Sequence, residues 1–327
     1  MIKKNTEDLH RNQLIRASWL YYIGGKNQVE IAKDMDISRF KVGRLLAESV
    51  RSGIVEIRIN ATESTLVSLE EQLKESFSLK YAVVAPVLDH QAPEAGHFIN
   101  VVDAVVHSGA NWLGNLLNRP ESMTLAVGWG QTLYKMAQLF NGLSLPQHKF
   151  VSLIGSLTRK SSFNSLDIIH LLSELTRAEG YIIPAPFLAD SYQDKQVLIN
   201  QRTVNDSFTL IDTADLAIVS IGELTDTSTL AKAGLIRKEE IHDLQAQGAV
   251  ADLLGFFINE DGEILDCEIN RCVTSYDMGK LANLDTVCIA AGKEKWQALK
   301  AAMNTGLING LIVDEWTAEW LLGNRQE

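Results

Sequence analysis

Hydrophobic positions near the N-terminus predict three helices followed by a strand. Apolar residues recur with helical spacing over 9–24, and two glycines then end that helix. Asn27 stands three residues before Glu30, the spacing of a capping box that opens a second, short helix. A third helix is expected over 38–52 with Ser38 as its N-cap, and apolar and polar residues then alternate over 54–59 as in a strand.

Two short helices joined by a tight turn, after a longer support helix, are typical of a helix-turn-helix domain. The third helix would then enter the major groove of DNA. Its core-facing stripe would consist of Val42, Leu45, Leu46 and Ser49. Phe40, Lys41 and Arg44 lie away from that stripe in the N-terminal half, so they are the candidate base-reading residues. Arg39 lies closer to the stripe and is expected to reach a phosphate.

The distribution of charge supports this interpretation. Residues 1–60 contain 11 Lys/Arg against 7 Asp/Glu, whereas 61–327 contain 19 against 34. A basic head on an acidic body suggests that the head binds an anion. The alternative is a three-helix packing module with a solvated basic face. A net charge of +4 is modest for a nucleic-acid binder, which suggests that each head works as part of an oligomer.

Residues 61–79 form the expected linker between head and body. Their apolar residues follow a single helical stripe, made of Leu66, Leu69, Leu73 and Phe77. A stripe of four residues is short for a coiled coil, so packing on the body is favoured over a dimer contact.

In residues 80–327 short apolar runs alternate with helix-length amphipathic segments. The runs lie at 81–85, 123–128, 150–155, 181–184, 216–222, 250–258, 286–291 and 310–313. The helical patterns include 97–117, 131–140, 165–178, 293–304 and 315–322. This alternation predicts a doubly wound α/β domain with a mainly parallel sheet. Asn259–Gly262 resembles a hairpin turn, so part of the region after Val250 is expected to be antiparallel.

One loop stands where ligands bind in such sheets, between a strand and the helix that follows it. It consists of Gly128, Trp129, Gly130, Gln131, Thr132 and Leu133. Its glycines would let the backbone approach an anion, and the helix N-terminus offers free N–H groups. The loop matches neither the dinucleotide-binding glycine pattern nor a Walker loop, so a single small phosphate is the better expectation. A tight strand–helix turn without a ligand is the alternative.

Three further strand ends are similar, and Gly222-Glu223 is one of them. Gly155 and Ser156 end one strand, and Lys295 follows another and would reach a phosphate as a point charge. The alternative for Lys295 is an exposed lysine in a first helical turn. Asp252 is a lone carboxylate in an apolar stretch, expected either to accept hydrogen bonds from sugar hydroxyls or to cap a turn.

Several classes of protein are disfavoured by what the sequence lacks. It has no run of 18 apolar residues and no signal-peptide core, so we expect a cytoplasmic protein without a membrane span. Cys267, Cys272 and Cys288 form no C-x-x-C motif, which fits a reducing compartment. The histidines show no metal-ligand spacing and no catalytic motif is present, so no metal, cofactor or catalytic residue is expected.

The chain resembles the SorC family of bacterial sugar-responsive transcriptional regulators over nearly its whole length. In the head the matching positions include Trp19–Tyr22, Gln28, Ile31-Ala32, Ile37-Ser38, Val42, Arg44–Leu46 and Gly53–Val55. In the body they include 127–133, 248–250 with Asp252, Ala291-Gly292 with Lys295 and Ala298, and much of 307–318. Phe77–Leu79 and 182–186 look most like LsrR-type members, which respond to phosphorylated autoinducer-2.

The resemblance implies a winged-helix or helix-turn-helix head on operator DNA, a body similar to sugar-phosphate isomerases and deaminases, and a homotetramer. It implies that 128–133 bind the effector's phosphate, that Asp252 holds sugar hydroxyls, and that Lys295 holds the phosphate or a hydroxyl. The matching Gln28 and Ser38 join the candidate DNA-binding residues. The effector would be a phosphorylated sugar or polyol, and regulation would more usually be repression.

Three departures from the family pattern bear on the effector. Ala251 precedes Asp252 where the family has glycine, Lys293 stands in the glycine-rich loop before Lys295, and the loop after Gly155 contains few glycines. Two competing functions stay open from the residues: an isomerase- or deaminase-like enzyme with a DNA-binding head, and a DNA-binding scaffold whose body only forms oligomers.

Overall fold

The computed structural model describes residues 2–55, 64–87, 101–156, 168–226 and 228–323, and gives no side-chain environment for 2–9 and 64. It divides the chain into two compact units. One comprises Met1–Ala61 with Leu139–Leu143, and the other Thr62–Gln138 with Ser144–Glu327.

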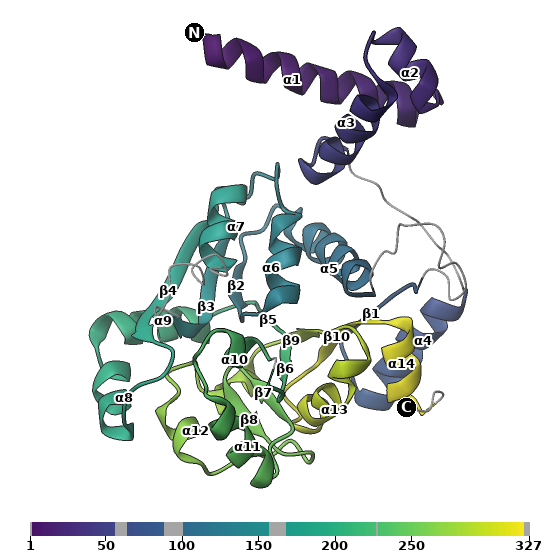
Figure 1. The fold of residues 1–327 in the computed structure, drawn as a ribbon. Coiled ribbons are helices and arrows are strands. Elements are labelled where there is room, and N and C mark those ends of the chain that lie inside the picture. Colours follow the sequence, from purple (N-terminus) through teal and green to yellow (C-terminus); the bar gives the residue numbers. More distant parts are fainter. Residues whose placement is uncertain (1, 56–63, 88–100, 157–167, 227, 324–327) are drawn as a thin grey trace. The chain divides into compact units, whose positions relative to one another are not determined.

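The smaller unit contains α1 (Ile2–Ser18), a π-helical turn (Trp19–Ile23), α2 (Gln28–Asp34) and α3 (Arg39–Arg51) (Figure 1). The helix predicted over 9–24 is therefore confirmed, with its last turn widened into a π-helix that Gly24 ends. The core contains Leu14, Ala17, Ile31, Val42, Leu45 and Leu46. Since these residues come from all three helices, the core ties the helices into one module.

Capping side chains fix both short helices. The Asn27 carboxamide accepts hydrogen bonds from the N–H groups of Val29 and Glu30, and the Glu30 carboxylate accepts one from Asn27 N–H in return. Ser38 Oγ accepts from Lys41 N–H at the start of α3. Asp36 turns the chain between the helices with a φ of 51°. The strand predicted over 54–59 falls mostly outside the described residues; Ile54 and Val55 form a bend.

The larger unit is built on a seven-stranded parallel sheet of order β1-β10-β9-β5-β2-β3-β4. Its strands are β1 (Tyr81–Ala85), β2 (Thr124–Val127), β3 (Lys149–Ser156), β4 (Glu179–Pro186), β5 (Leu216–Val219), β9 (Thr286–Ile289) and β10 (Gly310–Asp314). Every strand in this list overlaps a predicted apolar run. The central strands β5 and β9 are buried at every position, as expected for strands covered on both faces.

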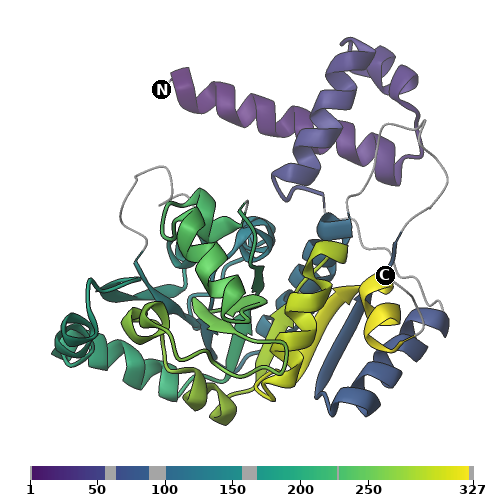
Figure 2. The same ribbon diagram turned by 60° about the horizontal axis from the view of Figure 1, so that its bottom comes forward.

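Helices cover both faces of this sheet (Figures 1 and 2). On one face α5 (Val101–Leu117), α6 (Gln131–Gln138) and α7 (Ile168–Thr176) pack side by side. The remaining helices are α4 (Ser64–Phe77), α8 (Tyr192–Ile199), α9 (Arg202–Asp212), α10 (Thr229–Lys232), α11 (Lys238–Ala246), α12 (Glu268–Cys272), α13 (Trp296–Asn304) and α14 (Glu315–Leu321). Among the described residues, 3₁₀ turns lie at Met278–Asn283 and Lys293–Lys295. The doubly wound α/β class is confirmed.

A second, antiparallel sheet follows β5 directly and consists of β6 (Ile221–Glu223), β7 (Ala251–Leu253) and β8 (Phe256–Ile258). The antiparallel region after Val250 is confirmed, and it contains a second, tighter turn besides the predicted one. The β7–β8 hairpin turns at Leu254 and Gly255, both with positive φ, and the predicted turn at 259–262 leads only to a single bridge between Ile258 and Ile264. Only Gly255 of this pair is a residue typical of such turns, whereas Leu254 is neither glycine nor asparagine, so the tighter turn was not predicted.

The linker helix α4 packs within the larger unit, against β1 and α14. Figure 2 shows it beside α14 at the edge of the sheet. Leu66, Leu69 and Leu73 of the predicted stripe are buried there. The packing expected for this stripe is therefore observed within a single chain.

We predict that Leu73→Ala lowers the free energy of unfolding of the larger unit by about 2–5 kcal/mol, because Leu73 is fully buried. Val67→Ala is the matched control, since Val67 is on the same helix and 51% exposed. Urea titrations followed by circular dichroism measure the difference. Equal effects of the two substitutions would show that α4 does not depend on this contact.

Candidate functional site

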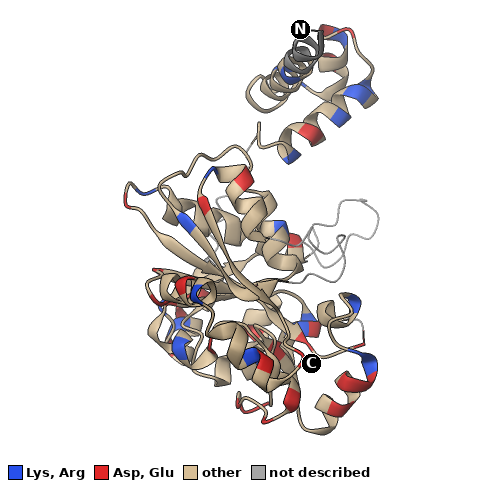
Figure 3. Cartoon of the chain, turned by 90° about the vertical axis from the view of Figure 1, so that its left-hand side faces the viewer, with Lys and Arg blue, Asp and Glu red and all other residues tan. Residues whose placement is uncertain are grey.

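The exposed face of α3 carries the DNA-reading candidates. Val42, Leu45, Leu46 and Ser49 are buried, as the helical pattern predicts. Phe40 is 90% exposed, and Arg39, Lys41 and Arg44 are exposed beside it. A large apolar side chain so exposed on a helix with basic neighbours is suited to contact with a thymine methyl group in a major groove. Figure 3 shows the basic positions distributed over the helices of this unit.

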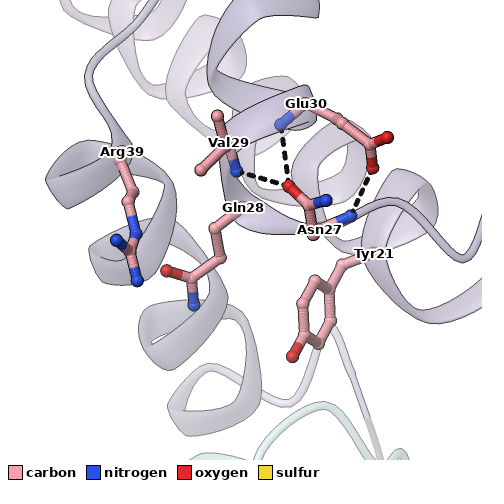
Figure 4. A pocket seen from close by; sticks show the side chains of 6 residues that line it. All are labelled: Tyr21, Asn27, Gln28, Val29, Glu30 and Arg39. Atoms are coloured by element: carbon pink, nitrogen blue, oxygen red, sulfur yellow. Dashed lines mark hydrogen bonds between the residues drawn. The ribbon is translucent and has the colours of Figure 1, made fainter.

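A shallow pocket of about 590 Å³ lies in the smaller unit between the π-helical turn and the starts of α2 and α3 (Figure 4). Its lining residues are Tyr21, Asn27, Gln28, Val29, Glu30 and Arg39. Gln28 and Arg39 were predicted from the sequence, and the structure brings them together. Tyr21 was missed, because its position depends on the π-helical widening of the turn. Ser38 is exposed and caps α3.

The larger unit has a switch point in its strand order. The chain builds β2, β3 and β4 outward in one direction, and then β5, β9 and β10 in the other. The crevice at the carboxyl ends of β2 and β5 is where open α/β sheets bind ligands. The 128–133 loop leaves β2 at this point, and Gly128 N–H donates to Ile218 O of β5 at 2.8 Å.

The backbone of this loop favours glycine at 130, and the space beside position 128 is tight. A β-carbon on Gly128 would lie 3.2 Å from Leu254 and 3.4 Å from the Ile218 carbonyl oxygen, and Gly130 has a φ of 129° beside Ser220. Helix α6 starts here, since Tyr134 N–H donates to Gly130 O. The N–H groups of residues 131–133 therefore lie ahead of the first helical hydrogen bond.

The side chains of the 128–133 loop differ in exposure, and not all of them are available to a ligand. Gln131 is exposed and Thr132 half-buried, whereas Trp129 packs near Phe187 with ring centroids 6.1 Å apart. Leu133 is fully buried in the core. A role for Leu133 at a ligand is thus confined to its backbone N–H.

Asp252 lies on β7 directly opposite Gly222 of β6. A β-carbon on Gly222 would overlap the Asp252 carboxylate, so any larger residue there would have to displace that side chain. Asp252 Oδ2 accepts a hydrogen bond from Gly255 N–H at 3.3 Å, which means that this carboxylate does cap the hairpin turn. Burial raises the pKa of Asp252 to about 6, against the opposing effect of the Lys295 ammonium.

Lys295 is partly buried and paired. Its Nζ donates to Ile221 O at 2.9 Å and forms an ion pair with the Glu223 carboxylate. The side chains of Lys295 and Glu223 are only 20% and 23% exposed. Lys295 is therefore not the exposed first-turn lysine of the alternative interpretation. Glu223 was noticed in the sequence only as a strand end, since the pairing depends on how β6 continues from β5.

The loop before Lys295 is anchored on the neighbouring strand. Gly292 has a φ of 93°, and its N–H donates to Asp314 Oδ2 at the end of β10. Asp314 also accepts from Thr317 N–H and Oγ1. These bonds fix the start of the turn that carries Lys295.

Gly155 and Ser156 belong to the last part of β3, beside an irregularity in its pairing with β4. A β-carbon on Gly155 would lie 2.6 Å from Thr274 Oγ1 and 2.8 Å from the carbonyl oxygens of Ala185 and Pro186. The glycine therefore meets a packing demand within the sheet. Residues 157–158 of the expected loop lie outside the described residues.

The structure thus brings some of the predicted effector-binding residues closer together than others. The 128–130 loop, Asp252 and Lys295 are all arranged around the junction of β5 and β6, through contacts with Leu254, Gly222 and Ile221. Gly155 and Ser156 are linked to them in two ways. Gly155 lies beside Thr274, and the neighbouring Ser275 hydroxyl donates to Leu254 O; Phe187 N–H donates to Ser156 O, and the Phe187 ring lies near Trp129.

Within the described ranges, no group of three or more His, Cys, Asp or Glu side chains is arranged to hold a metal ion. No described helix combines the length and the apolarity needed to cross a membrane. The three cysteines are buried and unpaired with one another.

Known proteins match this chain over nearly its whole length, and so over both units. The family model described as a sugar-binding domain matches residues 62–323. The erythritol catabolism regulatory protein EryD of Brucella abortus (strain 2308) is 30% identical over 94% of this chain and 96% of its own. The transcriptional regulator LsrR of Enterobacter sp. (strain 638) is 32% identical over 94% and 91%. The full-length sorbitol operon regulator SorC from Klebsiella pneumoniae has a TM-score of 0.67 at 26% identity, covering 96% of this chain and 99% of that one.

A helical head with an exposed basic helix, joined to a doubly wound domain with polar groups at its switch point, defines a ligand-responsive DNA-binding regulator. The chain belongs to the SorC family of sugar-responsive transcriptional regulators. The relatives compared are regulators, and the chain is accordingly a transcriptional regulator and not an enzyme.

We predict that the free energy of unfolding depends on pH through the titration of Asp252. An aspartate titrates near 3.9 in an unfolded chain, and here burial raises its pKa to about 6. Its contribution to stability is therefore fully present below about pH 4 and is lost as pH rises through about 6. Relative to wild type, Asp252→Asn should gain about 2 kcal/mol in unfolding free energy between pH 4 and pH 7.5. Denaturant titrations at several pH values measure this difference, and parallel pH curves would contradict it.

Proposed function

We propose that this regulator binds operator DNA through α3 and that a small phosphorylated sugar or polyol, bound at the β2–β5 switch point, modulates that binding. The observation that carries the proposal is the arrangement around the β5–β6 junction. There the free N–H groups at the start of α6 and the hydrogen-bonding side chains of Asp252 and Lys295 meet the same strand end.

The start of α6 is suited to binding a phosphate group, which favours a phosphorylated effector. The N–H groups of residues 131–133 offer donors, and the helix dipole adds partial positive charge at the same end. The glycines at 128 and 130 leave the backbone open to close approach. Asp252 and Lys295 supply acceptor and donor groups for hydroxyls, and two of the compared relatives are named for erythritol and sorbitol, both of which are polyols.

Repression of a carbohydrate or polyol operon by a homotetramer is the form of regulation proposed here. The modest positive charge of one head favours an oligomer, because several heads must together neutralise enough phosphates for tight binding. The effector would act by binding one arrangement of subunits more tightly than another.

We predict that Arg44→Ala lowers operator affinity by about 1–3 kcal/mol, because Arg44 is exposed on the base-reading side of α3. Arg16→Ala, which removes an exposed arginine from α1, is the matched control. Gel-shift titrations at one fixed salt concentration measure both variants. Operator binding that Arg44→Ala leaves unchanged would remove this residue from the interface.

We predict that sugar or polyol monophosphates raise the melting temperature of the protein, whereas their unphosphorylated parents and inorganic phosphate have smaller effects. A ligand at 100 times its Kd stabilises by about 2.7 kcal/mol, which a thermal-shift assay detects. Lys295→Ala should weaken the response with operator affinity retained, and Lys300→Ala, which removes an exposed lysine from α13, should not. A response to the parents alone would contradict the phosphate assignment. A body that ignores the whole panel would favour the scaffold function.

A further inference from the structure

The ammonium group of Lys295 is neutralised within the candidate site. Its Nζ contacts the Glu223 carboxylate and donates to the Ile221 carbonyl oxygen. Both side chains are largely buried, so solvent screens this ion pair less than it would screen a surface pair. A lysine held in this way is a poor partner for the phosphate of a ligand, because an approaching anion must compete with Glu223 for the same charge.

The balance of charge at this end of the site is negative. Asp252 is affected electrostatically by both Lys295 and Glu223, which places two carboxylates around one ammonium. The Cys288 thiol is also close to Lys295, but burial raises its pKa to about 12 and it contributes no charge. Above about pH 6 the cluster of Asp252, Glu223 and Lys295 therefore carries a net negative charge.

The other end of the candidate site, at the start of α6, carries positive partial charge. The 128–133 segment presents backbone N–H groups and the positive end of the α6 dipole. A ligand with one anionic end and one neutral end would satisfy both, with the anion at α6 and hydroxyls at the cluster. Carboxylates accept hydrogen bonds from hydroxyls, and Lys295 can donate one to a hydroxyl without losing Glu223.

We propose that Glu223 is a specificity-determining residue. By holding Lys295 in an ion pair, it makes the cluster of Asp252, Glu223 and Lys295 bind the hydroxyl-bearing end of the effector and reject a second anionic group. This inference rests on the proposed function and narrows its effector class to monophosphorylated sugars or polyols, excluding bisphosphates and sugar-acid phosphates.

Glu223→Gln tests the proposal with ligands that differ only at the end remote from the phosphate. One pair is glucitol 6-phosphate and 6-phosphogluconate, and a shorter pair is erythritol 4-phosphate and 4-phosphoerythronate; in each pair a terminal CH₂OH becomes a carboxylate. Glu294→Gln is the matched control, since it removes an exposed carboxylate next to Lys295 in the sequence. Calorimetric titrations of the full-length protein give the affinities.

Wild type and Glu294→Gln should prefer the polyol phosphate by about tenfold or more, since like charges at close range are costly. In Glu223→Gln the sugar-acid phosphate should gain affinity until the preference falls below about threefold or reverses. A preference that Glu223→Gln leaves unchanged would overturn the proposal. So would a wild-type protein that binds both members of a pair equally.

A second measurement needs no effector. Pyridoxal 5′-phosphate is an anionic aldehyde that forms imines with accessible lysines, and borohydride reduction fixes the product for peptide mass spectrometry. Labelling of Lys295 should be low in wild type and Glu294→Gln and several-fold higher in Glu223→Gln. If neither ligand pair binds any variant, the proposed effector class fails, and this labelling alone decides the role of Glu223. Equal labelling in all three proteins refutes that role.

Discussion

Residues 216–223 belong to two sheets, and the arrangement of the larger unit depends on this shared segment. As β5 it lies in the centre of the parallel sheet between β9 and β2, and after Ser220 it continues as β6 in the antiparallel sheet. The first part receives the 128–130 loop, and the second places Gly222 opposite Asp252 and Glu223 against Lys295. The separate parts of the candidate site thus share one strand as their common support.

The absence of a side chain at Gly222 is the most demanding point of this segment. The space that a β-carbon would occupy contains a carboxylate oxygen of Asp252. Since a buried carboxylate is costly unless it is paired or hydrogen-bonded, Asp252 needs both the Gly255 N–H and the nearby Lys295 ammonium. Lys295 in turn contacts Glu223. The positions of the Asp252, Lys295 and Glu223 side chains are therefore linked to the close approach of β6 and β7 at Gly222.

Local pattern predicted much of this structure and missed what depends on tertiary pairing. The strands of the parallel sheet, the caps at Asn27 and Ser38 and the buried stripe of α3 all follow from periodicity and capping chemistry, which act over a few residues. The ion pair of Glu223 joins positions 72 residues apart and needs the register of β6. Leu254 has a positive φ, which is rare for leucine, and Tyr21 lies in a π-helical turn. Neither conformation is predicted by local sequence pattern.

The two ends of the candidate site place different demands on a ligand. In the proposed mode of binding, the α6 end would act through backbone groups, so it would tolerate side-chain changes at 131–133 provided that the helix starts at the same residue. The cluster at Asp252 acts through side chains whose charges affect one another, so a single substitution there changes the preference of the whole group. In the proposed mode of binding, discrimination between ligands that share a phosphate would therefore depend on the β6–β7 end, and relatives with the same fold would differ in effector mainly through residues of that end.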